Sequence, residues 1–226
     1  MEYLPALKAS RGMRVRSELA AKFSAKYSNA PAVLAYYREA IQSAPNEFQP
    51  EDDILSDRVD PKVWGELFLE PLVQRCEQGK WDWAFSALRY RTGWKNRPAY
   101  VARISAALLK HHPILLRAVR QIPENELEPW ARAVREAGAV GDLALVELLK
   151  PALEDRRQAP INLGAGGVNE GRVCDRALFA ILNILDGDSF AAFKKAGVTD
   201  WNEKAFDRMI GVVKERLKTL QPPPTK

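Results

Sequence analysis

The sequence predicts an all-α protein built from stacked antiparallel helical hairpins, a short α-solenoid. Apolar residues recur at helical spacing along almost the whole chain, and no convincing run alternates apolar and polar residues as a strand does. Proline and glycine interrupt the pattern and leave helices of about 10 to 15 residues. Helices of this length joined by short turns favour hairpins that pack on one another.

The composition is that of a globular protein without membrane spans. The chain has 226 residues, of which 46% are hydrophobic and 28% charged, with a formal net charge of +5. No apolar run approaches the roughly 20 residues that cross a bilayer. Residues 1–5 lack the basic start and apolar core of a secretory signal, so we expect a cytoplasmic protein.

The first 60 residues predict two parts of opposite charge. Residues 1–43 form basic helices, one over 17–27 and one over 29–43, with Pro31 in its first turn. Residues 44–60 form an acidic linker that contains Pro45 and Pro50. The simplest interpretation of this polarity is that the acidic and basic parts neutralise each other within the fold.

A helical domain is expected over 61–220. Its first helix begins at Asp60-Pro61, a capping side chain followed by proline, and ends near Gly79. Pro71 should kink or split this helix, because proline cannot donate a helical hydrogen bond. A second helix covers 81–90 and ends at Gly93.

Proline and glycine also define the central helices. Pro98 opens a helix that runs to about residue 111, and Pro113 separates it from a short helix over 114–121. The next helix covers 123–137 and is expected to end at Gly138.

The last part of the chain shows the hairpin pattern best. A helix capped by Asp142 covers 142–153, a connector covers 158–171, and an amphipathic helix covers 172–185. A short helix begins at Asp188-Ser189, and Asp200 is expected to cap the final helix. Residues 221–226 should be a disordered tail, because three prolines cannot continue the helix.

Part of this region resembles a HEAT-type repeat. Residues 148–157 place a leucine-rich helix end before acidic and basic residues, and Val173 and Ala177 occupy the apolar and small positions of the second helix. Arg172 precedes Val173, where many HEAT repeats place the arginine after it. The resemblance covers about a fifth of the chain. It implies α-solenoid packing and an interaction role, and it carries over no catalytic residue.

The two cysteines, Cys76 and Cys174, lie far apart among apolar residues. Two thiols do not make a disulfide framework, so we expect buried free thiols. The histidines, His111 and His112, are adjacent, and on a helix their side chains diverge by about 100°. We therefore expect no shared metal site and no cofactor.

The segment 80–103 combines cations with aromatic residues, a composition that can neutralise phosphates and stack on bases. Trp81, Phe85 and Leu88 share a helix face, which favours a packed core with the cations on a solvated face. The alternatives are contact with a protein or with nucleic acid. The candidate binding residues are Arg89, Arg91, Trp94, Lys95, Arg97 and Arg103.

The connector before residue 172 is rich in glycine, with Gly164, Gly166 and Gly167 as candidate loop residues. Amides that precede a helix can hold an anion. No strand is predicted before this loop and no Gly-Lys-Ser/Thr follows it, so neither nucleotide-binding fingerprint is present. A flexible connector is the favoured interpretation.

These observations favour a non-enzymatic scaffold or interaction protein that binds another macromolecule, most readily a protein. No catalytic motif is present, and no pattern specifies an oligomeric state. The alternative is nucleic-acid binding through 80–103. Trp81-Asp82-Trp83 is similar to the Trp- and Asp-containing site of HEAT-like alkylpurine DNA glycosylases, but its register differs and no role is carried over.

Overall fold

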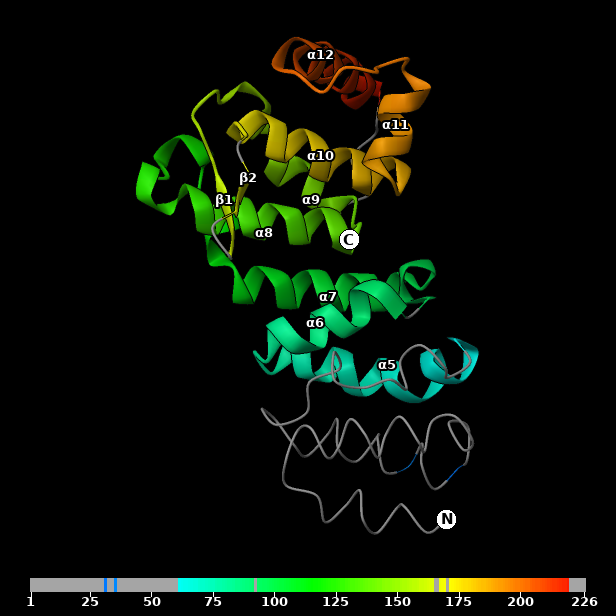
Figure 1. The fold of residues 1–226 in the computed structure, drawn as a ribbon. Helices are drawn as coiled ribbons and strands as arrows, with labels where there is room; N and C mark the ends of the chain where they lie inside the picture. The colour runs from blue at the N-terminus through cyan, green and yellow to red at the C-terminus, as the bar shows by residue number, and fades with distance from the viewer. Residues whose placement is uncertain are drawn as a thin grey trace. The chain divides into compact units, whose positions relative to one another are not determined.

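The structure, a computed structural model, describes residues 31, 35, 61–91, 93–164, 167–169 and 171–219. The predicted helices over 17–27 and 29–43, the linker over 44–60 and the tail over 221–226 lie outside these residues, except that Pro31 and Ala35 are helical. The chain divides into two compact units, residues 1–107 and 108–226, and the predicted domain 61–220 spans parts of both. Figure 1 shows the order of the elements.

The described part of the first unit is helical. It contains α5 (Pro61–Glu77), α6 (Trp81–Arg91), the 3-10 turn η2 (Gly93–Asn96) and most of α7 (Pro98–His111), close to the predicted bounds. Of the two effects expected of Pro71, a kink or a split, the split is wrong, because α5 runs through this residue. Pro71 is buried beside Leu72 and Val73, so packing against α6 offsets the missing hydrogen bond.

The second unit begins with short 3-10 turns: η3 (Pro113–Leu116), η4 (Val119–Gln121) and η5 (Glu124–Glu126). The single helix expected over 114–121 is therefore two separate turns. The helices that follow are α8 (Leu127–Val140), α9 (Ala144–Leu149), which continues as η6 (Lys150–Glu154), α10 (Val173–Asp186), α11 (Ser189–Lys195) and α12 (Glu203–Thr219).

Side-chain caps fix the starts of the last two helices. The short helix expected to begin at Asp188-Ser189 is confirmed as α11, and the Asp188 carboxylate caps it by accepting hydrogen bonds from the amides of Phe190 and Ala191. The cap predicted for the final helix at Asp200 is wrong. Asn202 Oδ1 takes that role and accepts from the Ala205 amide at 3.0 Å, because it directly precedes α12.

Helix α10 is the centre of the second unit. It lies between α8 and α12, and it packs most extensively on α8 (Figure 1). Its residues Val173, Ala177, Leu178 and Ile181 are fully buried, as the apolar stripe predicts. The predominantly helical class is thus confirmed, while the solenoid stacking of hairpins stays a prediction.

Gly138 lies inside α8, so the prediction that it ends this helix is wrong. The helix stops at Gly141, which adopts a left-handed φ of 77°. A Cβ placed on Gly138 would lie 2.8 Å from Ala180 Cα, so this glycine allows α8 and α10 to approach closely.

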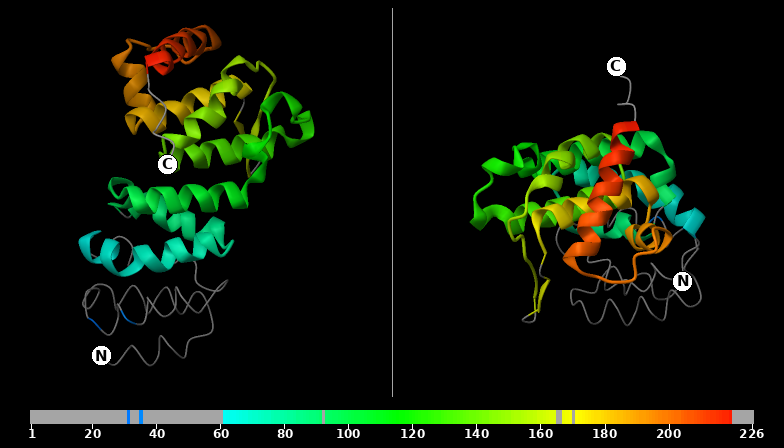
Figure 2. Two further views of the ribbon diagram at one scale, coloured as in Figure 1. Left: turned by 180° about the vertical axis from the view of Figure 1, so that it is seen from behind. Right: turned by 90° about the horizontal axis from the view of Figure 1, so that it is seen from above.

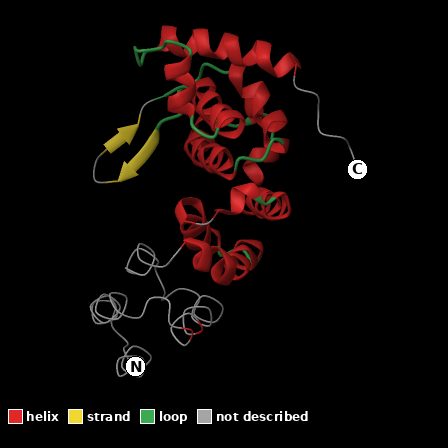
Figure 3. Cartoon of the chain, turned by 90° about the vertical axis from the view of Figure 1, so that its right-hand side faces the viewer, coloured by secondary structure: helices red, strands yellow, loops and turns green. Residues whose placement is uncertain are grey.

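The connector before α10 is an antiparallel β-hairpin and not an unstructured link. Strand β1 (Ile161–Gly164) pairs with β2 (Gly167–Asn169), with Ile161 opposite Asn169. The Ala159 amide donates to the Gly171 carbonyl at 2.7 Å and closes the base. Figures 2 and 3 show the hairpin extending away from the helices of its unit.

None of the helices that the structure describes is long and apolar enough to pass through a lipid bilayer.

We predict that Gly138→Ala lowers the free energy of unfolding by about 1–3 kcal/mol, because its methyl group would push α8 away from α10. The control is Gly211→Ala in α12, where a Cβ meets nothing within 4 Å. That change should raise the stability by about 0.5–1 kcal/mol through helix propensity. Urea denaturation of both variants tests the contrast, and equal shifts would contradict close packing at Gly138.

Candidate functional site

A cavity of about 360 Å³ lies beside α10 in the second unit. Ala131 and Arg135 of α8 line it together with Phe179, Ala180 and Asn183 of α10. Ligand sites have volumes of about 300–1,000 Å³ and are mostly apolar with a few polar groups. This cavity, called the α10 pocket below, has both properties.

Five aromatic rings gather at one wall of the α10 pocket and beyond it. This aromatic cluster consists of Phe179, Phe190, Phe193, Trp201 and Phe206. Phe193 is fully buried and its ring centre lies 5.2 Å from that of Phe179, whereas Phe190 is 63% and Trp201 50% exposed at a separation of 5.1 Å. The cluster is therefore anchored at its base and open to solvent at its top.

The turn between α10 and α11 holds Phe190 in place. Gly187 adopts a φ of 77°, which reverses the chain after α10. The buried Ser189 amide donates to Asn183 Oδ1 at 2.8 Å, and the Asp188 cap fixes the first turn of α11. Phe190 is thus exposed on an ordered backbone and not on a loose loop.

Two of the charged groups at the α10 pocket are engaged within the unit. Asp175 is bound on both oxygens by Arg172, and Arg176 donates Nε to the Ala159 carbonyl at 3.0 Å. A Cβ on Gly171 would lie 3.0 Å from Arg176 Cζ, so the glycine makes room for this guanidinium. Arg135 differs, because it forms no hydrogen bond or ion pair within the described part of the chain.

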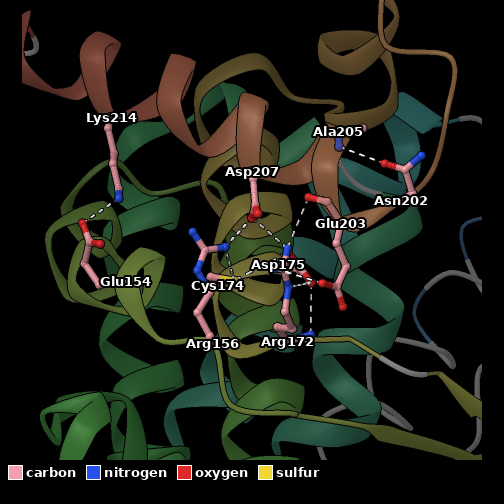
Figure 4. A network of polar contacts seen from close by, with 10 residues as sticks. All are labelled: Glu154, Arg156, Arg172, Cys174, Asp175, Asn202, Glu203, Ala205, Asp207 and Lys214. Carbon is pink, nitrogen blue, oxygen red and sulfur yellow. Dashed lines mark hydrogen bonds and ion pairs between the residues drawn. The ribbon is translucent and has the colours of Figure 1, made fainter.

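A network of ion pairs ties α12 to the start of α10 (Figure 4). Arg172 is 6% and Asp175 5% exposed, and their closest ion-pair distance is 2.9 Å. Arg172 also reaches Asp207 of α12 at 2.9 Å, and Arg156 pairs with the same carboxylate. This network connects three segments of the chain, which are the segment around Arg156, the start of α10 and α12.

The pKa values in the network follow from these contacts. The hydrogen bond to Asp175 raises the pKa of Arg172 above its ordinary value. At Asp207 burial raises the pKa, but hydrogen bonds from Arg172 and Arg156 outweigh it, and the net pKa is lowered. Both groups are charged at neutral pH.

Cys174 is buried beside this network. Burial and the neighbouring Asp175 carboxylate raise the pKa of its thiol to about 11. A thiol that stays protonated at neutral pH is a poor nucleophile. Cys76 is buried as well, so the prediction of two buried free thiols is confirmed.

The candidate binding residues of 80–103 have different environments where the structure describes their side chains. Arg89 and Arg91 belong to α6, whose side chains at these two positions lie outside the description. Lys95 and Arg97 are exposed. Trp94 is fully buried and donates Nε1 to the Leu88 carbonyl at 2.8 Å, so its ring packs inside the first unit.

Arg103 is held by two carboxylates of α5. Its guanidinium reaches Glu70 at 2.8 Å and Glu77 at 2.7 Å. These hydrogen bonds raise the pKa of Arg103, and they lower the pKa of Glu70 and of Glu77. The contacts stabilise the α5–α7 packing of the first unit.

The remaining sequence candidates show no converging geometry. Gly164 ends β1 and Gly167 begins β2, while Gly166 lies outside the described residues. His112 Nε2 lies 2.9 Å from Glu136 Oε2, and His111 ends α7. Within the described ranges no group of three or more His, Cys, Asp or Glu side chains could hold a metal ion.

The aromatic cluster is not among the site residues predicted from the sequence. Four of its five rings fall within residues 190–206, and that local concentration was the available signal. The helical spacing of Phe190 and Phe193 is equally typical of a core, so exposure could be learned only from the packing.

We predict that Asp175→Asn lowers the free energy of unfolding by about 3 kcal/mol, because it leaves Arg172 buried without its main counter-charge. Asp186→Asn is the control. It breaks the exposed pair with Arg216 and should cost less than about 1 kcal/mol. Equal losses in chemical denaturation would show that burial adds nothing to the Arg172 pair.

We also predict an alkaline transition that depends on Cys174. Its pKa is raised to about 11 from an ordinary 9.0, so the unfolded chain loses the proton first. The stabilisation is therefore complete below pH 9 and is lost as pH rises towards 11, by an amount on the order of 2 kcal/mol. Cys174→Ala should flatten this decline in denaturation curves from pH 8 to 11. Lysines and tyrosines common to both chains cancel, and parallel declines would count against the buried thiol.

Comparisons with known proteins leave this site to be interpreted on its own. Protein-family models, curated proteins and solved structures were each searched, and none of the three searches finds a match. The similarity to HEAT repeats rests on residues 148–157 and 172–177, and it stays a prediction.

Proposed function

We propose that this chain is a non-enzymatic binding protein that engages a protein partner through the aromatic cluster and the α10 pocket. The observation that carries the proposal is the exposure of two neighbouring rings, Phe190 on the first turn of α11 at 63% and Trp201 in the connection before α12 at 50%. Single exposed apolar residues are common, but two aromatic rings in contact beside a pocket form a patch.

The energetics of such a patch favour binding. Aromatic side chains have few rotatable bonds, so fixing them at an interface costs little conformational entropy. Interface hot spots are enriched in Trp, Tyr and Arg and lie next to pockets. Trp201 and Arg135 are two of these residue types within one unit, and Phe190 adds a further exposed aromatic ring.

An interaction role also agrees with the helical architecture. HEAT-like repeats, which residues 148–177 resemble, use their surfaces to hold macromolecules. In the described residues the buried polar groups at α10 serve the ion-pair network, and Cys174 is protonated at neutral pH. These features support a binding surface more strongly than a reaction centre.

Nucleic-acid binding through 80–103 is the weaker alternative. Lys95 and Arg97 remain exposed for phosphate contacts, but Arg103 is engaged by Glu70 and Glu77 and the Trp94 ring is buried. A buried ring offers no face for a base to stack on. We therefore place the binding site in the second unit.

Selection from a phage-displayed library of random dodecapeptides tests the proposal. We expect wild-type protein to select peptides, and the double variant Phe190→Ala/Trp201→Ala to bind them at least tenfold more weakly. The control is Leu116→Ala/Val212→Ala, which removes apolar residues that are 60% and 56% exposed elsewhere in the unit. An empty selection, or peptides that bind the cluster variant as well as wild type, would sink the proposal.

A further inference from the structure

We infer that the α10 pocket recognises an acidic peptide segment, in which one bulky apolar side chain enters the pocket and a neighbouring carboxylate binds Arg135. This inference rests on the proposed function and adds the chemistry of the partner. Three features support it: the cavity, the guanidinium of Arg135 and the exposed rings of Phe190 and Trp201.

The α10 pocket contains a positive charge, the guanidinium of Arg135. Arg135 lines the pocket one helical turn after Ala131, and it has no partner among the described residues. The nearby Asp175 carboxylate does not neutralise it, because Arg172 binds both of its oxygens. A guanidinium presents paired donors that match the two oxygens of a carboxylate. The pocket therefore carries an open position for an anion.

The apolar walls of the α10 pocket determine which side chain it can hold. Ala131 and Ala180 are small, so they leave space in the pocket. The rings of Phe179 on α10 and Phe206 on α12 form the wall on the other side of that space. A cavity of about 360 Å³ with these walls accommodates one large apolar side chain. Aromatic side chains gain the most here, since they can pack against the rings edge to face.

The side-chain amide of Asn183 offers a hydrogen-bond donor for the backbone of a peptide. Asn183 Oδ1 accepts the hydrogen bond of the Ser189 amide, so the amide nitrogen of Asn183 is the group that remains for a ligand. It makes no hydrogen bond within the described residues. A donor at the pocket wall suits a backbone carbonyl next to the buried side chain.

The position of Trp201 favours a peptide over a small molecule as the ligand. Trp201 does not line the cavity, whereas Phe190 does. The centre of the Trp201 ring lies 5.1 Å from that of Phe190, and Trp201 is half exposed. A ligand confined to the cavity would leave this ring in water. A peptide that continues past the pocket covers both rings, so the surface as a whole fits an extended chain.

The experiment uses the peptides selected on the full-length protein and their Asp→Asn and Glu→Gln counterparts. We expect the selected peptides to carry an aromatic or large aliphatic residue beside an acid. Neutralising that acid should weaken binding to wild type roughly tenfold, and Arg135→Gln should weaken the acidic peptide by the same factor. The two changes together should cost no more than either one, as expected for a direct pair.

Arg132→Gln is the matched control. It removes the same charge from α8, but Arg132 pairs with Glu128 and does not line the pocket. We expect less than a twofold effect. A loss equal to that of Arg135→Gln would show general attraction between charges, and it would overturn the pocket assignment.

The outcomes separate this inference from the proposed function. If the peptides depend on Phe190 and Trp201 but not on their acid or on Arg135, the proposed function stands and the inference falls. The small carboxylate 3-phenylpropionate is the second probe. If it binds alone with micromolar affinity and Trp201→Ala, which changes a ring outside the cavity, leaves its affinity unaltered, the pocket is a small-molecule site and the peptide assignment is overturned.

Discussion

The buried ion pair between Arg172 and Asp175 is the interaction on which the second unit depends. Its donors and acceptors lie within the first turn of α10, where the Asp175 carboxylate also accepts the Arg172 amide at 3.1 Å. The same guanidinium reaches Asp207, so one side chain fixes the start of α10 and the position of α12. A charge pair buried this deeply contributes little net stability, but it tolerates few alternative arrangements of the helices around it.

The aromatic cluster follows from that arrangement. Phe179 lies on α10 one turn after Asp175, and Phe206 precedes Asp207 on α12, so the ion pair sets the separation of the two rings. The approach of α8 at Gly138 brings Arg135 to the same pocket. The proposed binding surface takes its residues from α8, α10, α11 and α12, so polar contacts that position these helices also position the surface.

The sequence predicts much of the helical framework, because each helix there has a local signal. Pro98, Asp188 and the apolar stripe of 172–185 gave element starts and the buried face of α10 correctly. The errors concern residues whose role depends on distant neighbours. Glycine commonly ends a helix, yet Gly138 lies inside α8 and serves the contact with Ala180. The binding role expected for Arg103 stays a prediction, and its contacts with two carboxylates of α5 also depend on the fold. The hairpin was missed for a similar reason, since its seven strand residues are too few and too rich in glycine to show alternation.

The closed base of that hairpin makes the packing of α10 independent of the length of the turn between β1 and β2. Hydrogen bonds from the Ala159 amide to the Gly171 carbonyl and from the Val173 amide to the Arg157 carbonyl complete the connection into α10 before the strands begin. Lengthening the chain between β1 and β2 adds only loop-closure entropy, which grows slowly with length. We therefore expect that a fluorophore or affinity tag inserted there leaves α10 in place and the helices packed.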